Sequence, residues 1–139
     1  MAGKYDKYIK SKPLGKTNEL PEIKDILRFD FNSAEHKWGT DIIVGYGAID
    51  KPFFALKEPH THPYDEFVCL LGSNAMDLNE FDAEVEFYMG AEQEKHVFKS
   101  SVVIYCPANF PHCPLNFKVV NKPIVVLTIN MGNQYVRGQ

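Results

Sequence analysis

Residues 58–67 read EPHTHPYDEF and offer two histidines and a carboxylate at a spacing that suits a metal site built on β-strands. Successive side chains of a strand point to opposite faces, so residues two and six apart share a face. His60, His62 and Glu66 are therefore expected to project from one face of an extended segment. Proline within a sheet is confined to an edge, a strand start or a bulge. The stretch thus predicts three ligands on one face, provided that the strand continues through Pro63.

A second stretch, residues 107–116, reads PANFPHCPLN and supplies a third histidine, His112, which must arrive from a separate strand. Neutral imidazole suits iron, nickel, copper and zinc, and a carboxylate admits harder ions such as manganese. His60, His62, Glu66 and His112 therefore predict a site for a divalent transition metal, namely Fe, Mn, Ni, Cu or Zn. Structural zinc sites are usually rich in cysteine and closed by four ligands, so this donor set does not indicate one.

The two stretches together resemble the two motifs of the cupin superfamily. The residues that match are His60, His62, Glu66 and Gly72 for the first motif, and Pro107, His112 and Asn116 for the second. Asn109 stands where the second motif usually has glycine, and asparagine tolerates a left-handed backbone better than other residues with a side chain. The resemblance spans roughly residues 40–130. It implies a small single-domain cupin, or monocupin, with an all-β double-stranded β-helix, also called a jelly-roll barrel.

Short segments rich in β-branched and aromatic residues, separated by turn formers, also favour an all-β fold. The expected strands are residues 41–49, 66–71, 85–89, 96–99, 102–106, 117–120 and 124–129. A short helical turn is expected around residues 20–27, where Pro21 could open it. The expected organisation is an N-terminal arm with the first edge elements over residues 1–35, a barrel over 36–132 and a C-terminal tail over 133–139.

Length and composition are typical of one globular domain. The chain has 139 residues, of which 45% are hydrophobic and 24% charged, with a formal net charge of −3. This negative charge argues against nucleic acid as the main partner. No run approaches the roughly 20 apolar residues of a membrane helix, and the N-terminus lacks the apolar core of a secretory signal. We therefore expect a cytoplasmic protein with no membrane partner.

The three cysteines, Cys69, Cys106 and Cys113, form no C-x-x-C pair. Unbridged cysteines are most often buried and inert, so we expect buried or semi-buried thiols rather than metal ligands or nucleophiles. On regular strands Cys69 and Cys113 would point away from the proposed ligands because they differ from them in parity.

Several other polar and aromatic residues could contribute to the site or to its surroundings. Tyr64 shares parity with the ligands and Tyr105 precedes the second motif, so either phenol could reach a substrate as a donor or acid, although wall packing is the commoner role of such residues. Asp65 alternates away from Glu66 and is expected to face solvent or to support the ligands from outside. His36 and His96 lie outside the motifs and are expected to be hydrogen-bonded structural residues.

The resemblance implies a metal-dependent enzyme acting on a small polar substrate by dioxygenation, isomerisation or decarboxylation. In that interpretation the metal chelates an oxygen-rich substrate, and Glu66 is a ligand that could also detach and accept a proton. A divalent ion with one carboxylate and neutral imidazoles keeps a formal charge of about +1, which favours an anionic oxygen donor. A non-catalytic barrel that binds or senses a small metabolite stays open as the alternative. A structural or storage barrel has little reason to keep four converging ligands. The sequence contains no helix-turn-helix pattern, which argues against a transcription regulator.

The sequence around the motifs also suggests the character of the pocket and of the assembly. Apolar residues expected to line the pocket are Phe53, Phe54, Val68, Leu70, Phe110 and Leu115. The two arginines, Arg28 and Arg137, are both far from the motifs in sequence, so a substrate held by a guanidinium clamp is less expected. A homodimer is expected, in which residues from the first 30 pack on the partner, because open sheet edges gain from pairing and two-fold dimers are common.

Overall fold

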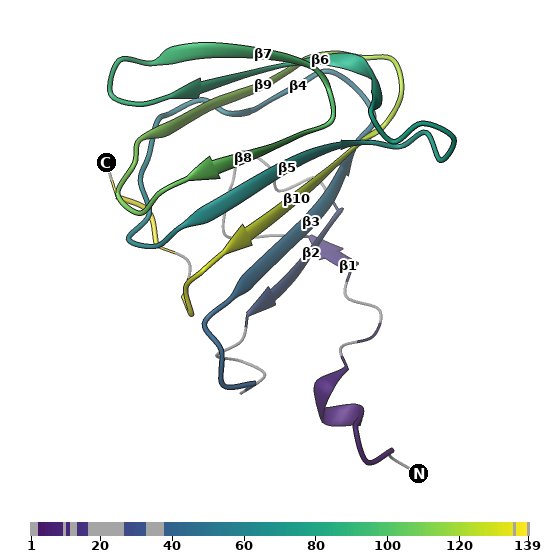
Figure 1. Cartoon of the computed structure of the whole chain (residues 1–139), viewed down its shortest axis with the longest axis vertical. Coiled ribbons are helices and arrows are strands. Elements are labelled where there is room, and N and C mark those ends of the chain that lie inside the picture. The colour runs from purple at the N-terminus through teal and green to yellow at the C-terminus, as the bar shows by residue number, and fades with distance from the viewer. Residues whose placement is uncertain are drawn as a thin grey trace.

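The protein folds into two antiparallel β-sheets that face each other (Figure 1). The structure is a computed structural model that describes residues 3–9, 11, 14–16, 27–32, 38–134 and 136–138. The six-stranded sheet has the order β1 (Leu14–Lys16), β2 (Leu27–Asn32), β3 (Ile43–Ile49), β10 (Ile124–Asn130), β5 (Glu66–Gly72), β8 (Val102–Cys106). The four-stranded sheet has the order β4 (Phe53–Leu56), β9 (His112–Val120), β6 (Glu80–Met89), β7 (Glu94–Ser100).

The all-β class predicted from the sequence is confirmed, and each of the expected strands overlaps an observed one. β6 and β9 are longer than expected, and β1, β2 and β4 were not predicted. Residues 20–26 of the expected helical turn lie outside the described residues, and Leu27 begins strand β2 rather than ending a helix. Near the N-terminus, residues Asp6–Tyr8 form a short 3-10 helix, η1, which lies apart from the sheets in Figure 1.

The hydrophobic core lies between the sheets and fills one end of the barrel. In β5 the side chains of Val68 and Leu70 point inward, and Leu70 is 0% exposed. Its large, completely buried neighbours come from both sheets and include Phe81, Phe87, Phe117 and Ile124. The register places Gly72 opposite Ile124 at the core end and Glu66 opposite Asn130 at the other end. Glu66, the first residue of β5, therefore places its carboxylate at the end of the barrel that the hydrophobic core does not fill.

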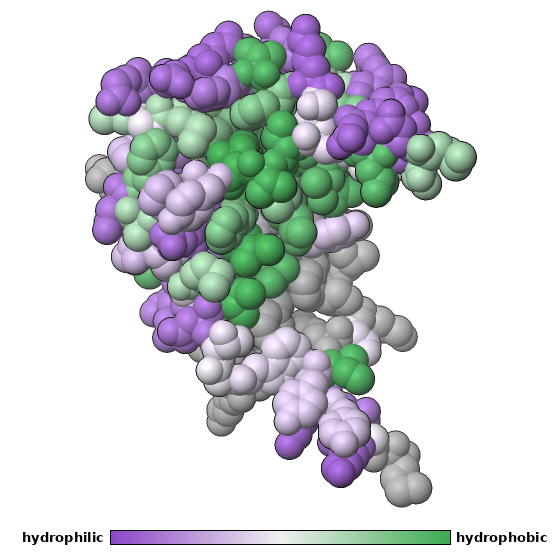
Figure 2. Space-filling model, viewed as in Figure 1, coloured by the Kyte–Doolittle hydropathy of each residue, from purple (hydrophilic) through white to green (hydrophobic). Residues whose placement is uncertain are grey.

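The outer face of the six-stranded sheet is also apolar over β3, β10, β5 and β8. On β3, β5, β8 and β10, the residues that point outward are Val44, Tyr46, Ala48, Phe67, Cys69, Leu71, Val103, Tyr105, Val125, Leu127 and Ile129. Val103 is 66% exposed and Tyr105 49% exposed. Figure 2 shows apolar residues gathered over β5, β10 and β3 in the view of Figure 1. We call this surface the apolar sheet face.

Within the described residues, no helix has both the length and the apolar character that crossing a membrane demands.

Candidate metal centre

The four predicted ligands come from three separate pieces of backbone at the open end of the barrel. His60 and His112 exchange backbone hydrogen bonds, with both N–H to O distances 3.0 Å, so the segment before β5 pairs with the start of β9. The condition that one strand runs unbroken through Pro63 is not met, because residues 63–65 form no strand. Pro63 lacks the N–H that continued pairing requires. The chain bends there and re-enters the sheet at Glu66, the first residue of β5.

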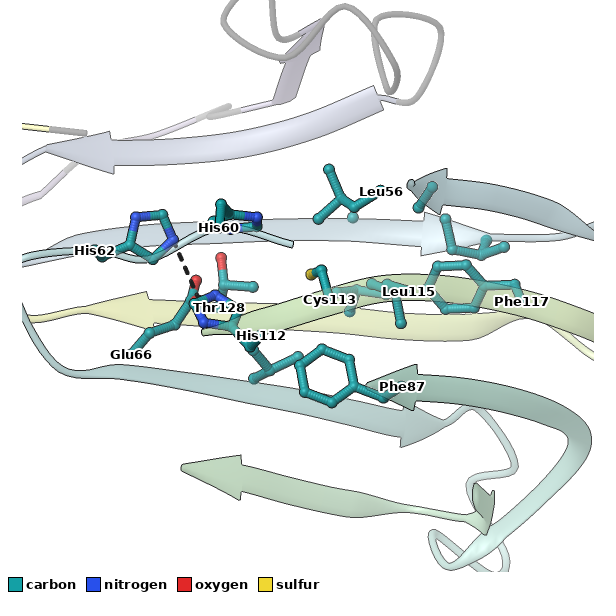
Figure 3. Close-up of a pocket in the computed structure, with 16 residues that line it drawn as sticks. Leu56, His60, His62, Glu66, Phe87, His112, Cys113, Leu115, Phe117 and Thr128 are labelled. Carbon is teal, nitrogen blue, oxygen red and sulfur yellow. Dashed lines mark ion pairs between the residues drawn. The ribbon is translucent and has the colours of Figure 1, made fainter. Parts of the chain in front are cut away.

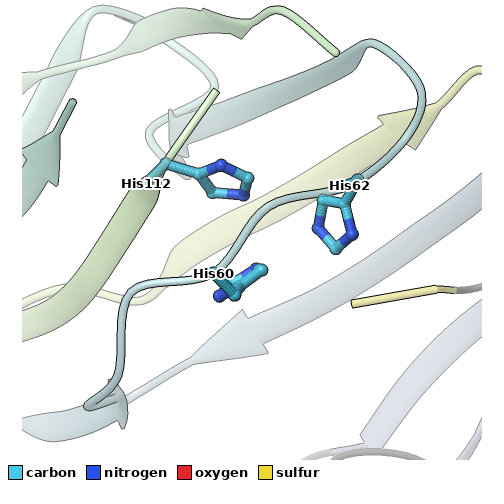
Figure 4. A group of neighbouring side chains, drawn as sticks. All are labelled: His60, His62 and His112. Atoms are coloured by element: carbon cyan, nitrogen blue, oxygen red, sulfur yellow. The ribbon is translucent and has the colours of Figure 1, made fainter. Parts of the chain in front are cut away.

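The bend nevertheless brings the ligands together, and their side chains converge (Figures 3 and 4). The three imidazole rings have centroids 4.5 to 5.2 Å apart. Oε1 of Glu66 lies 2.9 Å from Nε2 of His112 and 3.6 Å from Nε2 of His62. Ligand atoms of the three histidines all lie within 4.8 Å of one another. His60, His62, Glu66 and His112 are each 7% exposed or less.

The hydrogen bonds of the imidazoles fix which nitrogen faces the centre. Nδ1 of His62 lies 2.5 Å from the carbonyl oxygen of Val136, and Nδ1 of His112 lies 2.9 Å from that of Phe110. Nδ1 of His60 makes a longer contact of 3.4 Å with a carbonyl oxygen in its own segment. A carbonyl oxygen only accepts, so Nδ1 must carry the proton and the lone pair of the neutral ring is on Nε2.

The centre therefore presents imidazole nitrogens in the form that binds a metal. Within the described part of the chain, Nε2 of His112 is completely buried and makes no hydrogen bond of acceptable geometry, despite its short distance from Glu66. A buried nitrogen without a hydrogen bond is costly unless something else coordinates it. The donor set and this orphaned nitrogen both fit a divalent transition metal.

The electrostatic environment disfavours protonation of His60 and His62. Burial, and then the neighbouring His112 and His62, lower the pKa of His60 to about 3. Burial also lowers the pKa of His62, against the opposing effects of the Val136 carbonyl and Glu66. Metal ligation requires neutral imidazole, so the burial that disfavours protonation favours binding.

Two hydrogen bonds tie the second motif to the first. Asn109 has a φ of 64°, which confirms the expectation that this position needs a left-handed backbone. Its N–H donates to the carbonyl of His62 at 2.7 Å. The N–H of Ala108 donates to Oδ1 of Asp65 at 2.9 Å, so Asp65 supports the ligands from outside. The turn at residues 107–109 thus holds the ligand segment in place.

No family model and no curated protein matches the sequence. Among solved structures, a protein with a double-stranded β-helix domain from Klebsiella pneumoniae matches with a TM-score of 0.58 at 11% identity, over 99% of this chain and 95% of that chain. An oxalate oxidase bound to glycolate matches with a TM-score of 0.61 at 14% identity, over 95% of this chain and 63% of that one. This chain has the cupin fold. A variant of Bacillus subtilis oxalate decarboxylase matches with a TM-score of 0.52 at 10% identity, over 80% of this cupin but 26% of that chain.

The cavity of the cupin barrel lies directly against the ligands and is small. Its volume is about 90 Å³, and its walls are apolar apart from the ligands, Thr128 and Cys113. Val68 and Leu115, two of the residues expected to line it, do so, whereas Leu70, Phe53, Phe54 and Phe110 do not. Gly45 and Gly47 of β3 face the cavity, where their missing side chains leave space that a larger residue would fill. This role could not be predicted from the sequence, because a glycine within a strand usually weakens it.

The cysteines of the cupin are buried, as expected, and none forms a disulfide. Cys113 was expected to face away from the site but lines the cavity, because its φ of 76° breaks the alternation of β9. Cys106 lies opposite Glu66 in the sheet, and its thiol, with Glu66 and His112, forms a second group whose ligand atoms lie within 4.8 Å of one another. Burial, and then the charge of Glu66, raises the pKa of Cys106 to about 12, which favours the protonated thiol. Cys69 is one of the residues of β5 that point outward from the barrel, as expected.

The two tyrosines proposed from the sequence occupy different places. The ring of Tyr64 stacks on that of His62 at a centroid distance of 5.1 Å, and its hydroxyl accepts a hydrogen bond from the N–H of Val136 at 3.2 Å. Tyr105 belongs to the apolar sheet face, where it stacks on Phe67 at 5.2 Å. Burial and the nearby Asp65 raise the pKa of Tyr105. Its position outside the cavity does not support contact with a substrate there.

Of the two remaining histidines, only His96 lies within the described residues, and it does not belong to the centre. His96 lies on β7, where its Nε2 is 2.8 Å from Oε1 of Glu94, in keeping with a surface role. His36 lies outside the described residues.

The C-terminal segment lies beside the ligands, which the sequence did not suggest. Gly138 pairs with Thr61 through two backbone hydrogen bonds of 2.9 and 2.7 Å. The charge of Arg137 contributes to lowering the pKa values of His60 and His62. Arg137 is far from both motifs in sequence, yet its charge acts on two of the proposed ligands. Long-range pairing of residues 61 and 138 brings Arg137 there, and no local pattern in the sequence reports such pairing.

Proposed function

We propose that this cupin is a metal-dependent enzyme that binds one divalent transition metal through His60, His62, Glu66 and His112 and acts on a small, oxygen-rich substrate. The observation that carries this proposal is the set of Nδ1 contacts with carbonyl oxygens, which orients the lone pairs of the buried imidazoles toward one centre. A structural role for three buried histidines would instead leave both nitrogens of each ring hydrogen-bonded.

The chemistry proposed is of the dioxygenase, isomerase or decarboxylase type, with the dioxygenase type favoured. The bound metal would supply Lewis acidity and a template for a chelating substrate. Support comes from the oxalate oxidase and oxalate decarboxylase structures of similar fold, whose named substrate is a small oxygen-rich acid. The small size of the cavity agrees with a substrate of few atoms.

The residues of the chain have distinct roles in this proposal. The apolar walls of the cavity exclude water and strengthen the electrostatic interactions inside. Glu66 holds a negative charge at the centre, between His62 and His112, and is the carboxylate placed to accept a proton if it leaves the metal. Tyr64 has the role of positioning His62 in this proposal, because its ring stacks on the imidazole and does not line the cavity.

The test is elemental analysis of the purified protein beside three variants. His62→Ala and His112→Ala are expected to lose most of the bound metal, because each removes a ligand. His96→Ala is the matched control, since it removes an imidazole that pairs with Glu94 on the surface, and it should keep full occupancy. Equal metal loss in His96→Ala would refute the ligand assignment. Absence of metal from the parent protein, even after reconstitution, would favour the non-catalytic barrel that binds or senses a small metabolite.

We further propose a cytoplasmic homodimer in which the apolar sheet face and the N-terminal arm contact the partner. Four strands about 4.8 Å apart and five residues at about 3.3 Å give the face a footprint of roughly 300 Å², less than the about 800 Å² per partner of a standard interface. The exposed side chains of Tyr5, Tyr8 and Ile9 around η1 offer additional apolar area. The buried, unbridged thiols support a reducing compartment.

Sedimentation velocity tests the dimer. Removing residues 1–11 deletes η1 but keeps β1 and β2, which belong to the sheet. Val103→Lys places a charge on the edge strand β8 of the apolar sheet face, at a side chain that is 66% exposed. Each change is expected to shift the protein toward monomer, and a dimer that persists in the double variant would contradict the proposal.

A further inference from the structure

The segment of residues 136–138, which we call the C-terminal strap, runs directly against the ligand segment. The carbonyl oxygen of Val136 accepts from Nδ1 of His62 at 2.5 Å, and the N–H of Val136 donates to the hydroxyl of Tyr64 at 3.2 Å. Two residues on, Gly138 exchanges backbone hydrogen bonds with Thr61. Both neighbours of Arg137 are therefore fixed to residues of the metal centre.

The register of this pairing decides the face on which Arg137 lies. Thr61 and Gly138 are an antiparallel, hydrogen-bonded pair. This bridge is isolated, and continuing its register by one residue would place Arg137 opposite His62 as a non-hydrogen-bonded pair, in which side chains approach most closely. Residues opposite one another in an antiparallel pair project from the same face. Arg137 thus shares the face of the ligands, in agreement with the effect of its charge on both His60 and His62.

The formal charges of the centre change when Arg137 is included. A divalent ion and Glu66 leave about +1, and the guanidinium adds positive charge at the border of the centre. The cavity beside the ligands has a volume of about 90 Å³. Together they favour a compact anion.

We propose that Arg137 is a specificity-determining residue that pairs with a carboxylate of a small dicarboxylate ligand, and that the C-terminal strap holds it beside the metal centre. This inference rests on the proposed function and deepens it. A guanidinium can bind a carboxylate through two parallel hydrogen bonds, which a lysine cannot reproduce. Arg137 is itself exposed, so its charge lies at the border of the centre, where the outer carboxylate of a chelated ligand would lie.

The test is calorimetric titration of the metal-loaded protein with malonate, a small dianion, and with malonamide, its uncharged analogue. The variants are Arg137→Gln, Arg137→Lys and, as the matched control, Arg28→Gln, which removes the other arginine of the chain. Metal content is measured on the same samples. Loss of a hydrogen bond to a charged group weakens binding by about 10- to 100-fold, which is the loss of malonate affinity expected for Arg137→Gln. Arg137→Lys should recover only part of it, and Arg28→Gln should bind malonate as the parent does.

Each outcome separates this inference from the proposed function. Metal in every sample with equal malonate affinity in Arg137→Gln and the parent would overturn the assignment of Arg137 alone. Malonate and malonamide binding equally well to the parent would do the same, as would failure of the metal-loaded parent to bind malonate. Loss of metal from Arg137→Gln would show that Arg137 supports the centre structurally instead. A parent protein that binds no metal would refute the proposed function and this inference with it.

Discussion

Removal of residues 135–139 is expected to weaken metal binding although it removes none of the proposed ligands. The deletion takes away the carbonyl of Val136, which accepts from Nδ1 of His62 at 2.5 Å, and both backbone hydrogen bonds to Thr61. Without that acceptor the imidazole can rotate or change tautomer. Loss of such a hydrogen bond to a metal-ligating histidine typically costs about 10- to 100-fold in affinity, or about 1.4 to 2.8 kcal/mol.

Two variants of the full chain separate the contributions to this effect. Tyr64→Phe keeps the ring that stacks on His62 but loses the hydroxyl that accepts from Val136, a net hydrogen bond of about 0.5 to 1.5 kcal/mol. It should therefore lose less affinity than the deletion does. Arg137→Gln removes the cation that disfavours positive charge at His60 and His62, so it should bind metal at least as tightly as the parent.

The assay is competition for Zn²⁺ with a coloured chelator, with circular dichroism melting curves to establish that each variant is folded. The expected order of affinity is Arg137→Gln equal to or above the parent, then Tyr64→Phe, then the deletion. A folded deletion variant that binds Zn²⁺ within about threefold of the parent would refute the reasoning, because the hydrogen bond from His62 to the Val136 carbonyl would then contribute less than such bonds usually do.

Three further predictions concern the barrel itself. Gly47→Val adds a side chain to a cavity of about 90 Å³, so we expect normal metal content but at least tenfold weaker malonate binding by calorimetry, and unchanged binding would contradict it. Leu70→Ala removes a side chain that is 0% exposed and should cost about 3 to 5 kcal/mol in urea denaturation; a loss below 1 kcal/mol would disprove the position assigned to the core. Burial raises the pKa of the Cys69 thiol, so less thiolate exists at pH 8 than in the unfolded chain. Iodoacetamide should therefore label Cys69 slowly in the native protein and quickly in urea, and equal rates would be inconsistent with its burial.

Much of the fold could be predicted because a strand leaves a local pattern of residues in the sequence. Residues 67–71 and 102–106 are continuous apolar runs that include β-branched and aromatic residues, and both lie in strands. Strand β2, with the sequence LRFDFN, alternates apolar and polar residues in the manner of a strand, but a helical interpretation of the preceding residues obscured it. Strand β4 is FFAL, which is too short for its period to be recognised.

The ligand set could be proposed from spacing, whereas its surroundings could not. The orientation of His62 depends on a carbonyl 74 residues away, and Cys113 faces the cavity because of a single positive φ. Neither dependence leaves a local pattern in the sequence. The placement of Arg137 has the same cause, since it follows from a pairing between Thr61, just before β5, and Gly138 near the C-terminus.

The separation of His62 from Val136 along the chain also bears on the order of events during synthesis. At about 5 to 20 residues per second, the 74 residues between them take about 4 to 15 s to translate. His60 and His62 leave the ribosome early, while His112 and then the strap follow later. Until they arrive, a nascent chain offers an ion only two neighbouring imidazoles and one carboxylate. Metal acquisition is therefore expected to follow translation of the strap, so that a shortage of metal in the cell would leave a folded apoprotein rather than an arrested nascent chain.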